Sequence, residues 1–414
     1  MLAPPPEFRY VKVPNNRSTC SSCQKHNPMT EPQNKALLPA GMSDTLPPDA
    51  AFEAQVLEQL LSAFAGHGYQ QVKPPLIEFE EGLLAGLGTA SSSQTFRVMD
   101  PISQRMMGVR ADMTPQVARI AASRLKTAPR PLRLSYAGQV LRIKGSQLRP
   151  ERQFSQVGTE LIGIAEATAD AEIIVMAANA LKKLGVSGLS IDLGIPTLVP
   201  AICRELKVSD ETSGKLRLAL DRKDAAEVAQ LRDDLGSKGC DILGTMLAAA
   251  GPARKTMDIL KELDLGAEAG AEYQALAEVI SLIETAAPDL TMTVDPVENR
   301  GFEYHSGVTF TFFVRGVRGE LGAGGRYIAN SGTGMQEPST GLTLYMDTVL
   351  RALPGHEPED RIFLPFGTAV KAAEKLRDDG WVAVAGLVAV DDDEAEATRL
   401  HCTHIFTANE TRKL

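Results

Sequence analysis

The stretch VLRIKGSQLRPERQFSQVGTE, residues 140–160, decides the fold, because it predicts two strands joined by a polar loop. The loop carries Arg142, Arg149 and Arg152, and guanidinium groups bind anions such as carboxylates and phosphates. Lys144 follows two residues after Arg142, where a site that reads a nucleotide base needs a hydrogen-bond acceptor. Lysine has three donors and no acceptor, so the loop suits an anion better than a base.

Two more segments show the same hairpin pattern. Residues 95–112 predict two short strands around the turn Asp100–Ser103, and residues 307–327 alternate apolar and polar side chains before a glycine-rich turn. Sheets made of hairpins are antiparallel, so a doubly wound dinucleotide fold is disfavoured. Apolar residues at helical spacing predict helices that begin near Asp49 and near a capping Thr114. The expected fold class is α+β, an antiparallel sheet flanked by helices.

The chain of 414 residues is longer than one typical domain. Residues 1–35 are polar and proline-rich, and we expect a disordered extension there. Residues 36–355 form the expected core, with a helix-rich, charged insertion at about 197–285. Residues 360–414 alternate strand and helix and predict a small α/β domain.

Composition narrows the classes of function. The formal net charge of −9 and the pI near 5.4 do not favour nucleic acid as a partner. Apolar runs stay well short of the roughly 18 residues that span a bilayer, so we expect no membrane insertion. Five scattered cysteines fit a reduced, cytoplasmic chain better than a disulfide framework. No cofactor or metal is expected.

Several motifs resemble one family, histidyl-tRNA synthetase together with its paralogue, the regulatory subunit of ATP phosphoribosyltransferase. LPAGMSDTLPPDA (38–50) is similar to the family's opening segment, and GYQQVKPPLIE (68–78) resembles class II synthetase motif 1. VRADMT (109–114) resembles the amino-acid-binding loop, RGFEYHSGVTF (300–310) the histidine-specific motif, and AGGRY (323–327) the strand after it. The resemblance spans most of the chain and implies a class II aminoacyl-tRNA synthetase-like sheet.

The resemblance also implies a histidine-binding pocket. Free histidine presents a carboxylate, an ammonium and an imidazole, so a dry pocket needs a cation and hydrogen-bond acceptors. By resemblance, the carboxylate goes to Arg300, the ammonium to Asp112, Thr114 and Gln156, and the ring to Glu160, Tyr304 and His305. Arg142 is then left to hold part of the amino acid.

Two of these positions depart from the synthetase pattern, because Asp112 replaces a glutamate and His305 replaces a tyrosine. Each residue taken alone also has an ordinary structural explanation. Arg300 and Asp112 suit ion pairs, Thr114 suits a helix cap, and the others suit the polar side of a strand. Their joint occurrence inside matching motifs favours the ligand pocket.

The nucleotide-binding motifs are altered. The glutamate of synthetase motif 2, which accepts from adenine, is Lys144 here, and in motif 3 Tyr345 replaces a glycine and Thr348 an arginine. Such losses weaken ATP binding by about two to four powers of ten. A shifted register that uses Arg351 is the open alternative. Residues 361–387 resemble only the start of the synthetase anticodon domain, and the acidic run at 391–396 disfavours tRNA.

The expected function is that of a non-catalytic regulatory subunit of ATP phosphoribosyltransferase, needed for the first step of histidine biosynthesis and for feedback by histidine. The resemblance implies two partners, the catalytic subunit of ATP phosphoribosyltransferase and histidine as ligand, with a homodimer inside a hetero-oligomer. The alternatives are an active histidyl-tRNA synthetase with an unusual nucleotide site and a histidine-sensing module for another partner. Histidine-dependent pyrophosphate exchange separates the first alternative from the regulatory function.

Overall fold

The computed structural model describes residues 37–84, 94–145, 149–298, 304–330, 336–355, 359–408 and 410–414. The expected disordered extension at 1–35 and the expected ligand residue Arg300 lie outside these residues. No helix within the described segments is long and apolar enough to cross a membrane.

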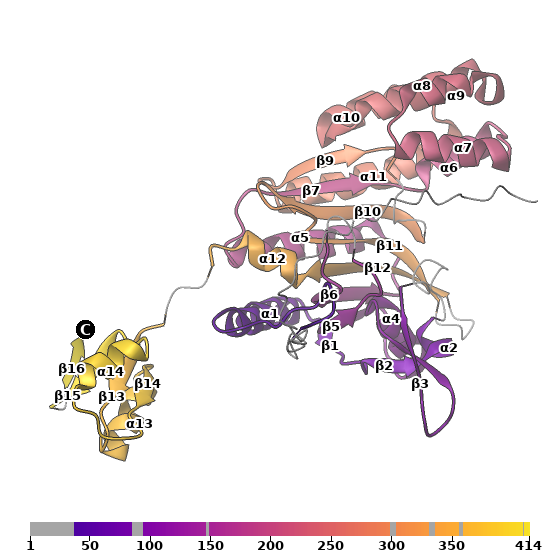
Figure 1. The fold of residues 1–414 in the computed structure, drawn as a ribbon. Coiled ribbons are helices and arrows are strands. Elements are labelled where there is room, and N and C mark those ends of the chain that lie inside the picture. Colours follow the sequence, from indigo (N-terminus) through magenta and orange to yellow (C-terminus); the bar gives the residue numbers. More distant parts are fainter. Residues whose placement is uncertain are drawn as a thin grey trace, which may run out of the picture. The chain divides into compact units, whose positions relative to one another are not determined.

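A nine-stranded sheet organises the core, in the order β1-β5-β6-β12-β11-β10-β7-β9-β8 (Figure 1). Its strands are Gln70–Gln71 (β1), Leu132–Leu141 (β5), Gln153–Ile162 (β6), Leu189–Gly194 (β7), Gly251–Pro252 (β8), Thr291–Asp295 (β9), His305–Val314 (β10), Gly322–Asn330 (β11) and Gln336–Tyr345 (β12). The hairpins β5–β6 and β10–β11 confirm the antiparallel sheet predicted from residues 140–160 and 307–327. The class is α+β.

Towards its two edges the sheet also contains parallel strand pairs, which were not predicted from the sequence. β1 pairs with β5 in parallel, and β7 pairs with β9 in parallel. Parallel neighbours need a long crossover connection, and the helices between β7 and β9 supply it. These helices are Leu198–Glu205 (α6), Asp210–Asp221 (α7), Ala225–Gln230 (α8), Arg232–Ala249 (α9), Ala253–Lys261 (α10) and Gly266–Ala286 (α11).

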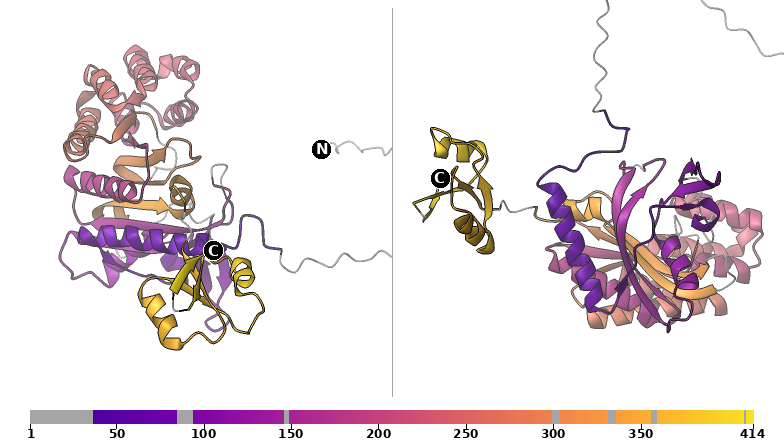
Figure 2. Two further views of the ribbon diagram at one scale, coloured as in Figure 1. Left: turned by 90° about the vertical axis from the view of Figure 1, so that its left-hand side faces the viewer. Right: turned by 90° about the horizontal axis from the view of Figure 1, so that it is seen from below.

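Helices cover the sheet on two sides. The helices Asp49–Gly66 (α1) and Ala167–Lys183 (α5) lie along one face and share its core with α11 (Figure 2). The helix Thr114–Ser123 (α4) packs with Phe154 of β6 in a second core. Its N-cap residue is Met113 rather than the predicted Thr114, because the helix begins one residue earlier than the Thr-Pro signal suggested.

Alternation along β6 sets which side chains face α4. Val157 and Leu161 belong to the core under α1 and α5, whereas Phe154 packs with α4. Because successive strand residues point to opposite faces, Gln156 and Glu160 share the face of Phe154. Two polar side chains, both fully buried, are thereby placed four residues apart under α4.

The pairing of β6 with β12 determines the space around these two side chains. Glu160 lies opposite Gly341, and Gln156 lies opposite Tyr345. A Cβ atom on Gly341 would collide with Oε2 of Glu160, so glycine at this position leaves room for the carboxyl group where it now lies. Four residues further along β12, the ring of Tyr345 packs against Phe154 and Arg149, and the helix Met346–Ala352 (α12) follows directly.

Two smaller units complete the described chain. Strands Ile77–Phe79 (β2), Met106–Val109 (β4) and Phe96–Met99 (β3) form a three-stranded antiparallel sheet with the short helix Glu80–Leu83 (α2). The C-terminal unit contains Arg361–Leu364 (β13), Val370–Asp378 (α13), Val382–Ala385 (β14), Asp393–Arg399 (α14), His404–Thr407 (β15) and Glu410–Lys413 (β16). Its sheet order is β14-β13-β15-β16, and it has its own apolar cores.

A buried ion pair joins α5 to the middle of the sheet. Asp170 of α5 is almost completely buried, and its Oδ2 lies 2.6 Å from Nη2 of Arg326 on β11. Thr340 on β12 donates its hydroxyl to the other carboxylate oxygen at 2.6 Å. Burial raises the pKa of Asp170, while Arg326 and Thr340 oppose that rise. Arg326, within the AGGRY motif, therefore has a structural partner.

This arrangement predicts the stability of two matched variants. Arg326→Met leaves the buried Asp170 without its cation, and we expect the free energy of unfolding to fall by about 3–5 kcal/mol. Arg254→Met removes an exposed arginine whose ion pair with Glu284 is worth under about 1 kcal/mol. Urea unfolding of both variants measures the difference. Equal losses of stability would contradict the role assigned to Arg326.

Candidate functional site

The floor of the candidate pocket is the carboxyl group of Glu160. The hydroxyl of Tyr327 donates to its Oε2 at 2.8 Å, and the hydroxyl of Tyr136 lies 3.5 Å from its Oε1. Tyr136 also shares hydrogen bonds with Thr343 Oγ1 at 2.8 Å and with Thr114 Oγ1 at 3.2 Å. Hydroxyl groups from β5, β11, β12 and α4 therefore hold this carboxyl group in one place.

Burial controls the charge of this group. Desolvation raises the pKa of Glu160 to about 8, and the nearby Asp112 carboxylate adds to the rise. Hydrogen bonds from Thr114, Tyr327 and Tyr136 oppose it. At neutral pH Glu160 is therefore mainly a neutral acid, which can donate one hydrogen bond and accept others.

The side of the pocket is formed by the segment before α4. Asp112 Oδ1 accepts from the backbone N–H of Thr114 at 2.9 Å, and Gln156 Oε1 accepts from the N–H of Met113 at 3.1 Å. Gln156 Nε2 points to Asp112 Oδ2 at 3.4 Å. These contacts orient the Asp112 carboxylate, which is the acceptor that an ammonium group requires.

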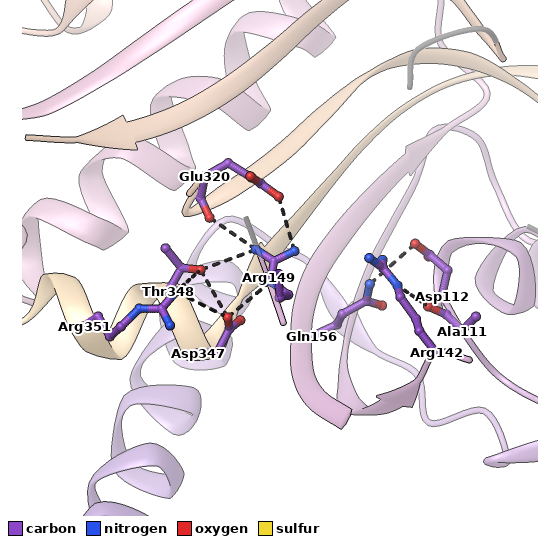
Figure 3. Close-up of polar contacts among 9 residues, drawn as sticks. All are labelled: Ala111, Asp112, Arg142, Arg149, Gln156, Glu320, Asp347, Thr348 and Arg351. Atoms are coloured by element: carbon purple, nitrogen blue, oxygen red, sulfur yellow. Dashed lines mark hydrogen bonds and ion pairs between the residues drawn. The ribbon is translucent and has the colours of Figure 1, made fainter. Parts of the chain in front are cut away.

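Arg142 lies beside these residues (Figure 3). Its Nε is 3.4 Å from the carbonyl oxygen of Ala111, and its guanidinium is 5.0 Å from the centre of the Phe154 ring. A guanidinium held on a ring face next to a carboxylate is placed to receive a second carboxylate from a ligand.

Two aromatic side chains, Tyr304 and His305, form one side of the candidate pocket, which we call the aromatic wall. His305 is the first residue of β10, and Tyr304 directly precedes it. The rings of Tyr304 and His305 lie 3.9 Å apart, and Tyr304 meets the edge of Tyr327 at 6.2 Å. His305 is buried, whereas Tyr304 is 60% exposed. His305 is therefore the inner ring and Tyr304 the outer ring. Tyr304 contacts Tyr327, which donates a hydrogen bond to Glu160.

The structure thus brings together seven of the predicted pocket residues, which are Asp112, Thr114, Arg142, Gln156, Glu160, Tyr304 and His305. Three further residues of the candidate pocket, Tyr327, Tyr136 and Thr343, were not predicted from the sequence. Tyr327 stands in the AGGRY motif, where the tyrosine was a usable signal. Tyr136 and Thr343 carry no local signal, because a tyrosine and a threonine in strands read as ordinary sheet residues.

Beside the candidate pocket, the space next to Tyr345 is taken up by other side chains of this protein. We call this space the recess. Arg149 is buried, with its guanidinium 3.7 Å from the centre of the Tyr345 ring. It forms ion pairs with Glu320 and Asp347, both at 3.2 Å, and contacts Thr348 Oγ1 at 3.3 Å (Figure 3). The anions that pair with Arg149 are therefore carboxylates of the same chain.

Arg351, the open alternative for nucleotide binding, belongs to the same cluster. Its guanidinium nitrogens lie 3.6 Å from Glu151 and 3.6 Å from Asp347, and one donates to Thr348 Oγ1 at 3.3 Å. Lys144 is exposed. Arg149 and Arg351 are thus both already paired with carboxylates of this chain.

The described residues contain no group of three or more histidine, cysteine, aspartate or glutamate side chains that could hold a metal ion.

Comparison with known proteins gives consistent results. The family model described as histidyl-tRNA synthetase matches residues 41–349. A protein of Paramagnetospirillum magneticum named ATP phosphoribosyltransferase regulatory subunit is 58% identical over 91% of this chain and 97% of its own length. A protein of Rhodospirillum centenum with the same name is 55% identical over 92% of this chain and 96% of its own length.

Two solved structures share the fold. One, from Bacillus halodurans, is described as an ATP phosphoribosyltransferase regulatory subunit/histidyl-tRNA synthetase; it has a TM-score of 0.78 and 25% identity, covering 89% of this chain and 97% of that one. A histidyl-tRNA synthetase from Nostoc has a TM-score of 0.74 with 15% identity, covering 92% and 96%. The chain belongs to the histidyl-tRNA synthetase family, and within it to the ATP phosphoribosyltransferase regulatory subunits.

Proposed function

We propose that this chain binds free histidine in the pocket around Glu160 and regulates the catalytic subunit of ATP phosphoribosyltransferase, without activating histidine itself. One observation carries the proposal. Along a single strand pair, Gly341 leaves space for the ligand-binding carboxyl group, whereas Tyr345 and Arg149 fill the space next to it. Next to the candidate pocket, the side chains of Tyr345 and Arg149 take up the space that a nucleotide would need.

The polar groups of the pocket match the three ends of histidine. Glu160 meets the imidazole, Asp112 accepts from the ammonium, and Arg142 receives the carboxylate. Arg300, which lies outside the described residues, keeps its expected role as the cation for the carboxylate, and Arg142 adds a second one. Tyr304 and His305 cover the ring. A histidine bound in this way has a partner for each charge, which offsets the cost of removing it from water.

The filled recess supports a role without adenylation. ATP would have to displace the Tyr345 ring and Arg149, and its phosphates would then face the carboxylates of Glu320 and Asp347. Displacing Arg149 would also leave those two carboxylates without a cation, which is strongly unfavourable in a buried site. Regulation of a partner enzyme requires only that histidine binds two states of the complex with different affinity.

An exposed apolar surface supports the expected homodimer. Ile77 and Phe79 of β2 point to the same side of the three-stranded sheet as Val98 of β3, and each remains more than one third exposed. Contiguous apolar side chains on a sheet face favour burial against another chain. The cytoplasm remains the proposed location, since the free thiols of Cys203, Cys240 and Cys402 fit a reducing compartment.

Calorimetry with histidine tests the pocket directly. Glu160→Ala removes the partner of the imidazole, and we expect histidine affinity to fall by about tenfold to a hundredfold. Glu81→Gln, at an exposed glutamate of α2, is the matched control and should bind histidine like the wild type. Unchanged affinity in Glu160→Ala would contradict the pocket assignment.

The pH dependence of binding follows from the pKa of Glu160. Near pH 7 the empty pocket carries one proton on Glu160 (pKa about 8), while free imidazole, with a pKa of about 6.5, carries none. In the complex, the carboxyl group of Glu160 and the imidazole ring share this one proton. Below about pH 6.5 binding must release a proton, and above about pH 8 it must take one up, so affinity should fall on both sides.

Titrations of affinity between about pH 5.5 and 9 check this expectation. Glu160→Gln has no ionisable carboxyl group at this position, so its affinity should be lower and should lose the decline that begins near pH 8. The same alkaline decline in the variant and the wild type would show that Glu160 does not supply the proton.

Activity assays separate the regulatory function from an active histidyl-tRNA synthetase. The purified chain should show no histidine-dependent pyrophosphate exchange, because its nucleotide recess is filled. Mixed with its cognate catalytic subunit, it should raise phosphoribosyltransferase activity, and histidine should then lower that activity. Pyrophosphate exchange by the chain alone would contradict the proposal, and exchange without any effect on the phosphoribosyltransferase would establish the synthetase alternative.

A further inference from the structure

Two arginines of the loop between β5 and β6 contact the same aromatic ring. The guanidinium of Arg142 lies 5.0 Å from the centre of the Phe154 ring, and that of Arg149 lies 5.1 Å from it. Arg142 reaches toward the pocket, where Asp112 and Gln156 lie, whereas Arg149 reaches into the filled recess (Figure 3). Phe154 is therefore a direct physical contact between the pocket and the recess.

A second contact runs through the sheet. Gln156, whose side chain holds the pocket segment before α4, lies opposite Tyr345 in the β6–β12 pairing. The Tyr345 ring meets the edge of the Phe154 ring at 6.0 Å and carries the guanidinium of Arg149 at 3.7 Å. Any ligand that shifts Gln156 or Phe154 thus acts on the ring against which Arg149 is packed.

Arg149 then connects this ring to α12. Asp347 and Thr348, which bind Arg149, stand in the first turn of α12, and Glu320 binds it from the turn before β11. A buried, fully paired guanidinium is costly to separate from its carboxylates. Arg149 is therefore held to the start of α12 by two contacts, with Asp347 and with Thr348. In the sequence α12 is followed by residues 353–360 and then by the C-terminal unit.

We propose that Arg149 is a positioning residue that transmits occupancy of the amino-acid pocket to α12, through its contacts with Phe154, Tyr345 and Asp347. A ligand carboxylate fixes Arg142 against Phe154, and the ring pair sets the position of Arg149. Arg149 in turn holds the first turn of α12 through Asp347. The inference rests on the proposed binding of histidine and adds the route by which that binding is communicated within this chain.

Hydrogen exchange with and without histidine tests the route in the full-length chain. In the wild type, saturating histidine should slow amide exchange in residues 346–352 by about fivefold or more, the lower end of ordinary allosteric coupling. In Arg149→Met, histidine should still bind, as measured by calorimetry, but exchange in α12 should no longer respond. If Arg149→Met alone fails to fold, the double variant Arg149→Met/Asp347→Asn replaces it in the experiment. In the double variant, Asp347→Asn removes a carboxylate that Arg149→Met would leave without its cation.

Arg105→Met is the matched control, because Arg105 also stacks on a phenylalanine, at 3.7 Å from the Phe79 ring, and pairs with a glutamate, but these partners belong to β2 and α2 rather than to β6 and α12. It should keep both histidine binding and the α12 response. An unchanged α12 response in the Arg149 variants would overturn the inference. So would a wild type that binds histidine without any response in α12. A wild type that does not bind histidine at all would overturn the proposed ligand, and this inference with it.

Discussion

The pairing of β6 with β12 is the constraint on which the rest of the site depends. Both strands are long, both lie in the middle of the sheet, and their register sets Glu160 against Gly341 and Gln156 against Tyr345. Gly341 leaves space for the buried carboxyl group of Glu160 opposite it. Four residues further along, the ring of Tyr345 occupies the space beside Phe154 and Arg149. A shift of this register by one residue would turn the pocket side chains to the opposite face of the sheet.

Burial has different consequences at the two neighbouring places. In the pocket it raises the pKa of Glu160 until the group is mainly neutral near pH 7, so that an empty pocket holds no unpaired charge there. In the recess the charges are kept and paired, with Arg149 between Glu320 and Asp347. A neutral, hydroxyl-bonded acid remains available to a ligand, whereas a closed ion-pair cluster does not.

Much of this arrangement could be predicted from the sequence, because hairpins and family motifs are local patterns. The alternation in residues 307–327 predicted the strands that carry the aromatic wall, and motif spacing placed Gln156 and Glu160 on one strand. Local patterns do not reveal partners across the sheet. Tyr136 was therefore missed, and Arg149 was interpreted only as one of the anion-binding arginines of the loop, although it is buried against Tyr345. Long-range register decides which arginine turns inward.

The closed cluster around Arg149 also bears on the evolution of the chain. Replacing Tyr345 by glycine alone would remove the ring on which the guanidinium rests, and replacing Arg149 alone would strand two buried carboxylates. Each single replacement would reduce stability, because the remaining members of the cluster would lose a packing or charge partner. The positions of this cluster are therefore energetically coupled, and a tolerated change at one of them requires a compensating change at another.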